Sequence, residues 1–274
     1  MNRSTYYKHY NTPESARSKE NAEIRRAILQ IYIKAKQRYG AVRIRQCLQA
    51  EYGISISLGR VYRLMKAMEL PAMATVKPRQ PGKPKEASSD LPNILQKRFS
   101  TDAPNRVWVS DITYIKVSGR FCHLCTIIDL FARKVIAFRV AYKADADLVI
   151  QTVMMALRNR GNPKGVLFHS DRGTQYTAAK FRRLLDELGF IQSFSAVGHP
   201  YDNAVAESFF KSLKHEETGR RRYLDLDDLS LSIFEYIHFF NTQRPHSANG
   251  GLTPEDTENA YFIQLPSDLS CPLF

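Results

Sequence analysis

The stretch VWVSDITYIKVSGRFCHLCTIIDLFARKVIAFRVAY, residues 107–142, decides the fold because it predicts three strands in succession. Its apolar runs are short and rich in β-branched and aromatic side chains, and Ser118 and Gly119 supply a turn between the first two. Runs this close together are expected to pair as antiparallel neighbours. The larger part of the chain therefore begins with a three-stranded antiparallel unit.

Helical and strand patterns alternate after this unit. We expect a helix at about residues 146–159, a strand at VLFHSD (166–171), a helix at AAKFRRLLDELG (178–189) and a strand at FIQSFSA (190–196), followed by further helices. Three strands followed by this alternation are typical of a mixed α/β plan. The predicted fold class is α/β, with a five-stranded mixed sheet and flanking helices.

The N-terminal region predicts a small all-α domain. A basic amphipathic helix is expected over residues 20–38, and two shorter helices over 42–51 and 58–69, with Ser57 capping the last one. This pattern resembles a helix-turn-helix at about residues 40–70. Its second helix would present three basic side chains to a DNA groove, namely Arg60, Arg63 and Lys66. Two basic helices around a glycine also fit an ordinary helical bundle.

Charge and composition divide the chain in the same place. Residues 1–90 hold 18 Lys and Arg against 7 Asp and Glu, whereas residues 91–274 hold 22 against 20. A concentrated positive segment indicates either a polyanion partner or a solvated basic face. Between the two parts lies a basic, proline-rich stretch that either tethers them or follows phosphates. The expected boundaries are 1–76 for the helical domain, 77–98 for the linker, 99–260 for the α/β core and 261–274 for a C-terminal tail.

Cysteine use and hydropathy predict a cytoplasmic protein. The four cysteines follow no apolar leader and form no convincing disulfide framework. No apolar run reaches the roughly 20 residues that span a bilayer, so no membrane partner is expected. The CHLC of residues 122–125 lies in a predicted buried strand and lacks a second ligand pair, which favours structural cysteines over zinc.

Three acidic residues carry the predicted chemistry. Asp111 lies in the first strand, Asp171 ends the fourth, and Glu207 follows Asp171 after 35 intervening residues. Ionised carboxylates that meet at one point repel each other, and a bound cation resolves the repulsion. Hard oxygen ligands favour Mg²⁺ or Mn²⁺ over zinc, and two such ions can act together at a phosphodiester.

Helix geometry tests whether Glu207 can face such a site. At 100° per residue, Asn203, Lys211 and Lys214 fall within about 40° of Glu207, while the apolar residues of the segment occupy another face. We therefore expect Glu207 to face the metals and the lysines to face phosphate oxygens. Other polar residues of the region are given structural roles: a helix cap for Asp202, and buried structural positions for Asp129 and His169. The role of His199 is left open.

Five ordered segments resemble the catalytic frame of the insertion sequence family three transposases, relatives of retroviral integrases. They are WVSDITY (108–114), IDLFARKV (128–135), HSDRGTQYT (169–177), PYDNAVAESFFKSLKHE (200–216) and FNTQRPH (240–246) followed by LTP (252–254). The resemblance implies an RNase H-like integrase core with a DDE triad of Asp111, Asp171 and Glu207. It also implies a basic residue seven positions after the Glu, which is Lys214.

The resemblance implies metal-dependent cleavage and joining of double-stranded DNA, at element ends and target, by self-associated protomers in a nucleoprotein complex. Two Mg²⁺ ions, replaceable by Mn²⁺, would be held by the triad, with Lys211, Lys214, Asn203 and Arg172 contacting DNA. In this family the catalytic frame is often fused behind a smaller frame that recognises the ends. We therefore expect this chain to be a downstream product that works with an upstream-frame DNA-recognition protein or as a fusion to it, located in the bacterial cytoplasm and on the nucleoid when bound to DNA. A non-catalytic DNA-binding regulator and an RNase H-like nuclease are the alternatives.

Overall fold

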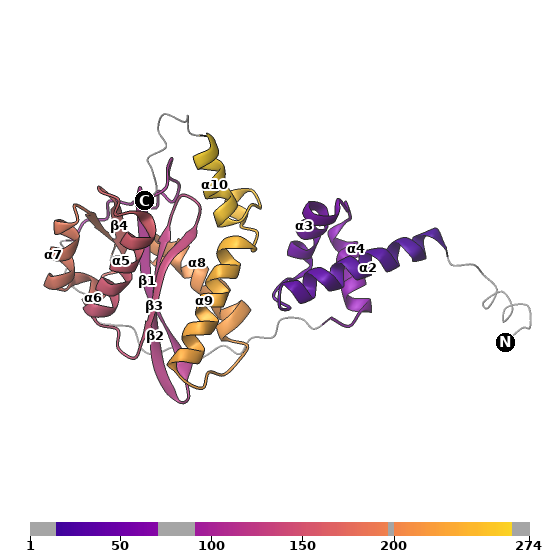
Figure 1. Ribbon diagram of the computed structural model, residues 1–274, viewed down its shortest axis with the longest axis horizontal. Helices are drawn as coiled ribbons and strands as arrows, with labels where there is room; N and C mark the ends of the chain where they lie inside the picture. The colour runs from indigo at the N-terminus through magenta and orange to yellow at the C-terminus, as the bar shows by residue number, and fades with distance from the viewer. Residues whose placement is uncertain (1–14, 71–90, 197–199, 265–274) are drawn as a thin grey trace, which may run out of the picture. The chain divides into compact units, whose positions relative to one another are not determined.

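The computed structural model describes residues 15–70, 91–196 and 200–264 (Figure 1). The chain divides into two compact units, Met1–Ala74 and Thr75–Phe274. We call them the N-terminal unit and the sheet unit. Among the described residues, no helix combines the length and the apolar character needed to cross a membrane.

The N-terminal unit contains the three helices that the sequence predicts. They are α2 (Ala16–Lys34), α3 (Ala41–Tyr52) and α4 (Leu58–Ala67). The hydroxyl of Ser57 accepts a hydrogen bond from the backbone nitrogen of Arg60, so the predicted cap of the third helix is confirmed. Ile28, Ile44 and Val61 come from different helices and are fully buried, which makes one small core.

The sheet of the second unit has the predicted mixed character. Strands β1 (Val107–Val117), β2 (Arg120–Asp129) and β3 (Lys134–Ala141) pair in an antiparallel manner. Strands β4 (Leu167–Ser170) and β5 (Ile191–Phe194) continue the sheet in parallel beyond β1, giving the order β3-β2-β1-β4-β5. Gly119 has a φ of 85° in the β1–β2 turn, a conformation that glycine adopts without strain.

Helices cover the sheet from both sides (Figure 1). One group consists of α5 (Ala146–Arg160), α6 (Thr174–Thr177) and α7 (Ala179–Glu187); the other consists of α8 (Ala204–Leu213), α9 (Leu226–Thr242) and α10 (Pro254–Gln264). The short helices η1 (Pro200–Asn203), η2 (Lys214–Thr218) and η3 (Ser247–Asn249) complete the second group.

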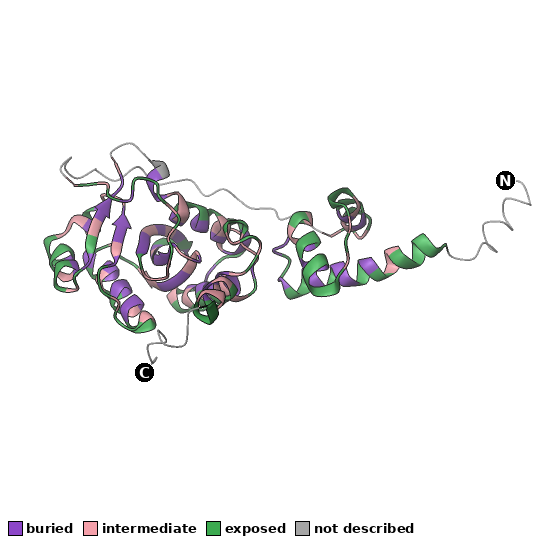
Figure 2. Cartoon of the chain, turned by 90° about the horizontal axis from the view of Figure 1, so that it is seen from above, coloured by how far each residue is buried: buried purple, intermediate pink, exposed green. Residues whose placement is uncertain are grey.

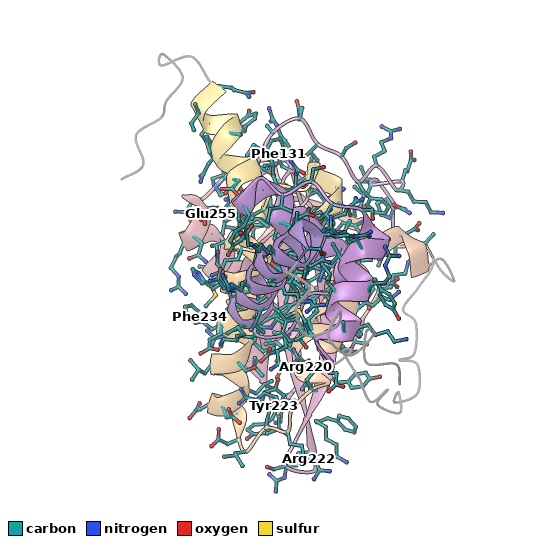
Figure 3. All side chains as sticks on the ribbon, turned by 90° about the vertical axis from the view of Figure 1, so that its right-hand side faces the viewer. Phe131, Arg220, Arg222, Tyr223, Phe234 and Glu255 are labelled. Carbon is teal, nitrogen blue, oxygen red and sulfur yellow. The ribbon has the colours of Figure 1, made fainter. Side chains whose placement is uncertain are left out.

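Burial follows the layers. The strands and the inward faces of the helices are buried, and the outer helix faces are exposed (Figure 2). Trp108 of β1 is fully buried and packs edge-on against Phe190, with ring centroids 5.4 Å apart. Figure 3 shows the side of the unit where α8, α9 and α10 lie. Toward one end of this side lie Arg220, Arg222 and Tyr223, and toward the other end lie Phe131 and Glu255.

Residues 91–98 belong to the sheet unit, although the sequence analysis predicted that they form the end of the linker. The carbonyl of Pro92 accepts a bond from the backbone nitrogen of Phe194 in β5, and the backbone nitrogens of Ile94 and Leu95 donate to Ser193 Oγ at 2.9 and 3.0 Å. Leu95 is 2% exposed. This segment, which we call the strap, is held by buried contacts that composition does not reveal. The expected boundary at residue 260 falls inside α10, which ends at Gln264.

Candidate active site

The candidate site starts on the segment of the central strand β1 that extends beyond its pairing with β4. Within the described part of the chain, β4 pairs with β1 at residues 107–109 alone, and no described strand pairs with the edge of β1 beyond this point on that side. Asp111 lies on this segment, and its Oδ1 accepts a hydrogen bond of 2.7 Å from the backbone nitrogen of Ile112. The sheet itself therefore fixes the first carboxylate.

Asp171 follows β4 directly and lies beside Asp111. The parallel register pairs Val109 with His169, and continuing it by two residues brings Asp171 level with Asp111. The backbone nitrogen of Gly173 donates to Asp171 Oδ1 at 2.9 Å, which fixes the carboxylate at the turn into α6. The predicted meeting of two strand-borne acids is thus found where parallel strands end.

Glu207 lies in the first turn of α8 and is exposed. The predicted two-faced helix is confirmed, because the apolar side chains Ala206, Phe209, Phe210 and Leu213 are buried. Asn203 precedes this helix and donates from Nδ2 to the carbonyl oxygen of Ser110 at 3.0 Å, which ties the start of α8 to β1 beside Asp111. The other polar side-chain atom, Asn203 Oδ1, is buried and has no hydrogen-bond partner among the residues that the structure describes.

The electrostatics show that the acids influence each other. Burial raises the pKa of Asp111 to about 8, and the negative charges of Asp171 and, to a smaller degree, Glu207 contribute to the rise. Burial also raises the pKa of Asp171 and of Glu207. In the described part of the chain, no three acidic, His or Cys side chains lie close enough to hold a metal ion as they stand. The site is therefore a close pair of aspartates with an exposed glutamate nearby.

The two lysines of α8 and η2 differ in environment. Burial lowers the pKa of Lys214, and the charge of Asp111 opposes this effect. Lys214 Nζ lies 5.0 Å from the centre of the Tyr114 ring, a cation–π arrangement. Lys211 is exposed in the last turn of α8. Lys214 is thus held near the acids, whereas Lys211 faces solvent.

The Arg172 guanidinium, which was expected at DNA, is bonded to backbone carbonyls of the protein. Its Nε donates to the carbonyl of Ser195 at 2.8 Å, and a terminal nitrogen donates to the carbonyl of Leu91 at 3.0 Å. Five donors in a rigid fork suit this bridging of backbone carbonyls. Arg172 therefore ties the turn after Asp171 to the strap.

The expected role of Asp202 as a helix cap is wrong, since no side chain of the described residues caps α8. Asp202 is 2% exposed, and its Oδ2 accepts bonds from the backbone nitrogen of Ala196 at 2.8 Å and from Asn93 Nδ2 at 2.7 Å. Its position within the tight 3-10 turn before α8 turns the carboxylate toward the strap. Asn93 was missed by the sequence analysis, because nothing in a linker-like stretch indicates a contact 109 residues away.

The remaining polar residues have the structural roles that were expected, where the structure describes them. Burial lowers the pKa of His169 to about 4, and its ring nitrogens contact Ser193 Oγ and Ser195 Oγ at 2.9 and 3.3 Å. Asp129 is fully buried and pairs with Arg160 at 3.0 Å. Cys122 and Cys125 are buried free thiols of β2. His199 lies outside the described residues.

In the N-terminal unit, the three residues expected at a DNA groove are not equivalent. Arg60 donates two bonds to Glu20, at 2.8 and 3.0 Å, and also reaches Asn21, so it joins α4 to α2 rather than facing outward. Its guanidinium finds a carboxylate across the helix pair, and the bidentate geometry favours this contact. Arg63 and Lys66 are exposed.

Comparisons with known proteins agree with this arrangement. The integrase core domain family matches residues 101–200 and 188–254, and the HTH-like domain family matches residues 19–79. The chain is 35% identical over 242 residues to the transposase for insertion sequence element IS904 of Lactococcus lactis, covering 86% of this chain and 95% of that protein. It is 34% identical over 236 residues to transposase InsF for insertion sequence IS3A of Escherichia coli, covering 85% and 81%. Among solved structures, the HTLV-2 integrase catalytic core domain in complex with magnesium aligns with 18% identity and a TM-score of 0.44, over 57% of this chain and 98% of that one.

Proposed function

Because this chain belongs to the bacterial insertion sequence transposases, DNA-processing enzymes with an integrase core, we propose that Asp111, Asp171 and Glu207 are its catalytic carboxylates. The reaction is DNA strand cleavage followed by strand transfer, and the three carboxylates would hold the divalent metal ions that this chemistry uses. The observation that carries the proposal is the position of Asp111, where burial raises its pKa to about 8 and the charges of Asp171 and Glu207 add to the rise.

The residues present fit a divalent metal. All three side chains offer hard oxygen donors, which suit Mg²⁺ or Mn²⁺. The repulsion between Asp111 and Asp171 is the kind that a cation relieves. The buried Asn203 Oδ1, which has no hydrogen-bond partner within the described ranges, adds an oxygen next to β1. Two ions bound there would activate the attacking hydroxyl and stabilise the leaving 3′ oxygen of the DNA.

The other residues are assigned by position. The charges of both other acids act on Asp111, so Asp111 would contribute oxygens to the metal site together with each of them. Glu207 is exposed at the start of α8 and supplies the third carboxylate of the site. Lys214 and Lys211 hold phosphate oxygens of the strand beside it, and Asn203 keeps α8 against β1.

The N-terminal unit supplies further contacts with double-stranded DNA. Arg63 and Lys66 lie exposed on α4, the second helix of the HTH-like pair, and face the DNA. The joining of two element ends to a target requires more than one protomer, so the active form is a self-associated complex on DNA. An upstream-frame protein that recognises the element ends is the further partner.

The test is a strand cleavage and joining assay with DNA that carries the element's terminal repeats. Separate Ala substitutions of Asp111, Asp171 and Glu207 should abolish both steps in Mg²⁺ and leave DNA affinity within about twofold. Lys180→Ala, on the outer surface of α7, is the matched control and should keep full activity. Unchanged joining by any one of the three acid variants removes that residue from the triad.

A further inference from the structure

The segment FNTQRPH (240–246) contains a buried cation, Arg244, that the proposed chemistry does not use. Arg244 follows α9 and is 6% exposed, and its partner Glu216 is 2% exposed. Arg244 Nε lies 2.9 and 3.2 Å from the two oxygens of Glu216, and a terminal nitrogen lies 2.8 Å from Oε1. The guanidinium also lies over the Phe240 ring, 5.1 Å from its centre. This is a buried, multiply bonded ion pair.

Glu216 belongs to an unusual turn that continues the helix of Glu207. Helix α8 passes directly into η2, a π-helix in which the backbone nitrogen of Gly219 donates to the carbonyl of Lys214 at 2.8 Å. Single π turns are rare and occur frequently at functional sites. This turn is held by its own side chains as well. Tyr236 donates to Glu216 Oε2 at 3.0 Å, and Ser232 donates to Glu217 Oε1 at 2.7 Å, so both glutamates are bonded to α9.

Arg244 also reaches the catalytic helix itself. A terminal nitrogen donates to Ser212 Oγ in the last turn of α8 at 3.1 Å. Glu207 lies in the first turn of the same helix, and Lys214 is its C-cap and the first residue of η2. An arginine bonded to the end of α8 and to the turn that follows therefore limits rotation of the helix about its axis. Such rotation would move Glu207 and Lys214 together, because they lie on one helical face.

We infer that Arg244 and Glu216 are positioning residues for the transposase reaction, which set the rotation of α8 and hence the placement of Glu207 and Lys214. The inference rests on the proposed roles of those two residues. A contribution to stability alone explains the contacts less well. Buried ion pairs add little net stability compared with apolar packing, whereas a bidentate pair specifies an orientation.

The test compares Arg244→Lys and Glu216→Gln with Arg160→Lys, all in the full chain. Arg160 is a matched control because it also forms a buried ion pair, with Asp129 and Glu258, and shares no hydrogen-bond partner with Arg244. Tyr236→Phe removes one bond from Glu216 and is the mild variant if the others do not fold. Four quantities are measured: the thermal midpoint, hydrogen exchange of the α8 amides without metal, the Mg²⁺ concentration for half-maximal cleavage, and the DNA dissociation constant.

Arg244→Lys and Glu216→Gln should lower the cleavage rate about 10- to 100-fold, the range typical of residues that orient ligands. They should raise the half-maximal Mg²⁺ concentration, speed exchange in residues 204–213, and leave DNA affinity within about twofold. Tyr236→Phe should shift the same quantities less. Arg160→Lys should lower the thermal midpoint without changing α8 exchange or the Mg²⁺ requirement.

A purely structural role is established if the Arg244 and Glu216 variants behave like Arg160→Lys. It is also established if Tyr236→Phe is the one variant of the three that folds and it leaves α8 exchange and the Mg²⁺ requirement unchanged. Either result overturns the inference. Asp111→Asn in the same assay separates this failure from the failure of the proposed function. An active Asp111→Asn protein contradicts the catalytic assignment, whereas an inactive one beside a normal Arg244→Lys protein contradicts only the positioning role.

Discussion

Asn203 donates a hydrogen bond to the carbonyl of Ser110, 3.0 Å away, and so joins the start of α8 to the strand of Asp111. These residues are 93 positions apart in the sequence. The bond connects the element that carries Glu207 with the element that carries the first aspartate. Because both ends of the contact are buried, its geometry is fixed by packing rather than by solvent.

Loss of this bond should reduce catalysis more than binding. Asn203→Ala removes the donor and leaves the Ser110 carbonyl without that partner, so α8 loses a restraint next to the site. We expect the cleavage rate to fall about 10- to 100-fold, as for other residues that orient catalytic ligands. The DNA dissociation constant should change by less than about threefold. Single-turnover cleavage and fluorescence anisotropy measure the two effects, and an equal loss in both contradicts the orienting role.

Without bound metal, the folded protein should be more stable when Asp111 is replaced by a side chain that cannot ionise. The pKa of Asp111 is about 8 in the folded state, above the value of ~3.9 for an unfolded Asp, so ionisation favours the unfolded chain. Its destabilising effect is absent below pH ~4 and grows as the pH rises toward 8. Asp111→Asn should therefore raise the thermal midpoint by about 3 °C or more at pH 8 in EDTA, because ~1 kcal/mol corresponds to ~2–4 °C in a chain of this size.

The same substitution should have no stabilising effect at pH 4, where both side chains are neutral. Differential scanning fluorimetry at the two pH values checks the sign. A lower midpoint for Asp111→Asn at pH 8 would mean that the carboxylate has a favourable partner in the metal-free protein, and that the acids do not repel.

The attachment of the strap to the sheet unit should depend on the hydrogen bonds that Asp202 accepts. Asp202→Ala leaves the backbone nitrogen of Ala196 and the amide of Asn93 without their acceptor, and a buried group that loses its partner costs ~1–3 kcal/mol. We expect urea unfolding of the sheet unit at lower denaturant concentration. In a double-mutant cycle, Asn93→Ala should cost much less in the Asp202→Ala background than in the wild type. Additive losses would show that the two side chains do not act on each other.

The basic residues of α4 should separate into two kinds. Arg63→Ala and Lys66→Ala should each reduce the slope of log affinity against log salt concentration by about 0.9 for every lost phosphate contact. Arg60→Ala should keep the slope, because Arg60 is bonded to Glu20 and Asn21, and should instead loosen α2 from α4. Binding titrations at four salt concentrations give the slope for each variant and show which residues contact phosphate. Equal slopes for all three variants and the wild type contradict the assignment.

Local patterns predicted the elements well. The alternation in residues 107–142 set the antiparallel strands, Ser57 marked the start of α4, and the helical face of Glu207 followed from its spacing. The sequence also placed Asp111 in the first strand and Asp171 at the end of the fourth, where adjacent strands could bring them together, and β1 and β4 are neighbours in the sheet.

The partners of charged side chains were harder to predict. Arg60 pairs with a residue 40 positions earlier, and Arg172 reaches a carbonyl 81 positions earlier. Neither contact has a local signal, since each depends on how distant segments pack. The strap was assigned to the linker for the same reason. Its proline and polar residues are typical of an extended tether. The contacts that hold it are made with distant elements, by Leu95 with β5 and by Asn93 with η1.

The most direct test of the central claim is the anomalous scattering of Mn²⁺ in crystals of the full chain bound to DNA with the element's terminal repeat. We predict manganese peaks bonded to oxygens of Asp111, Asp171 and Glu207 at ~2.1–2.2 Å, a typical distance for such hard cations. Manganese bound without Glu207, or bound away from both aspartates in that complex, would contradict the account.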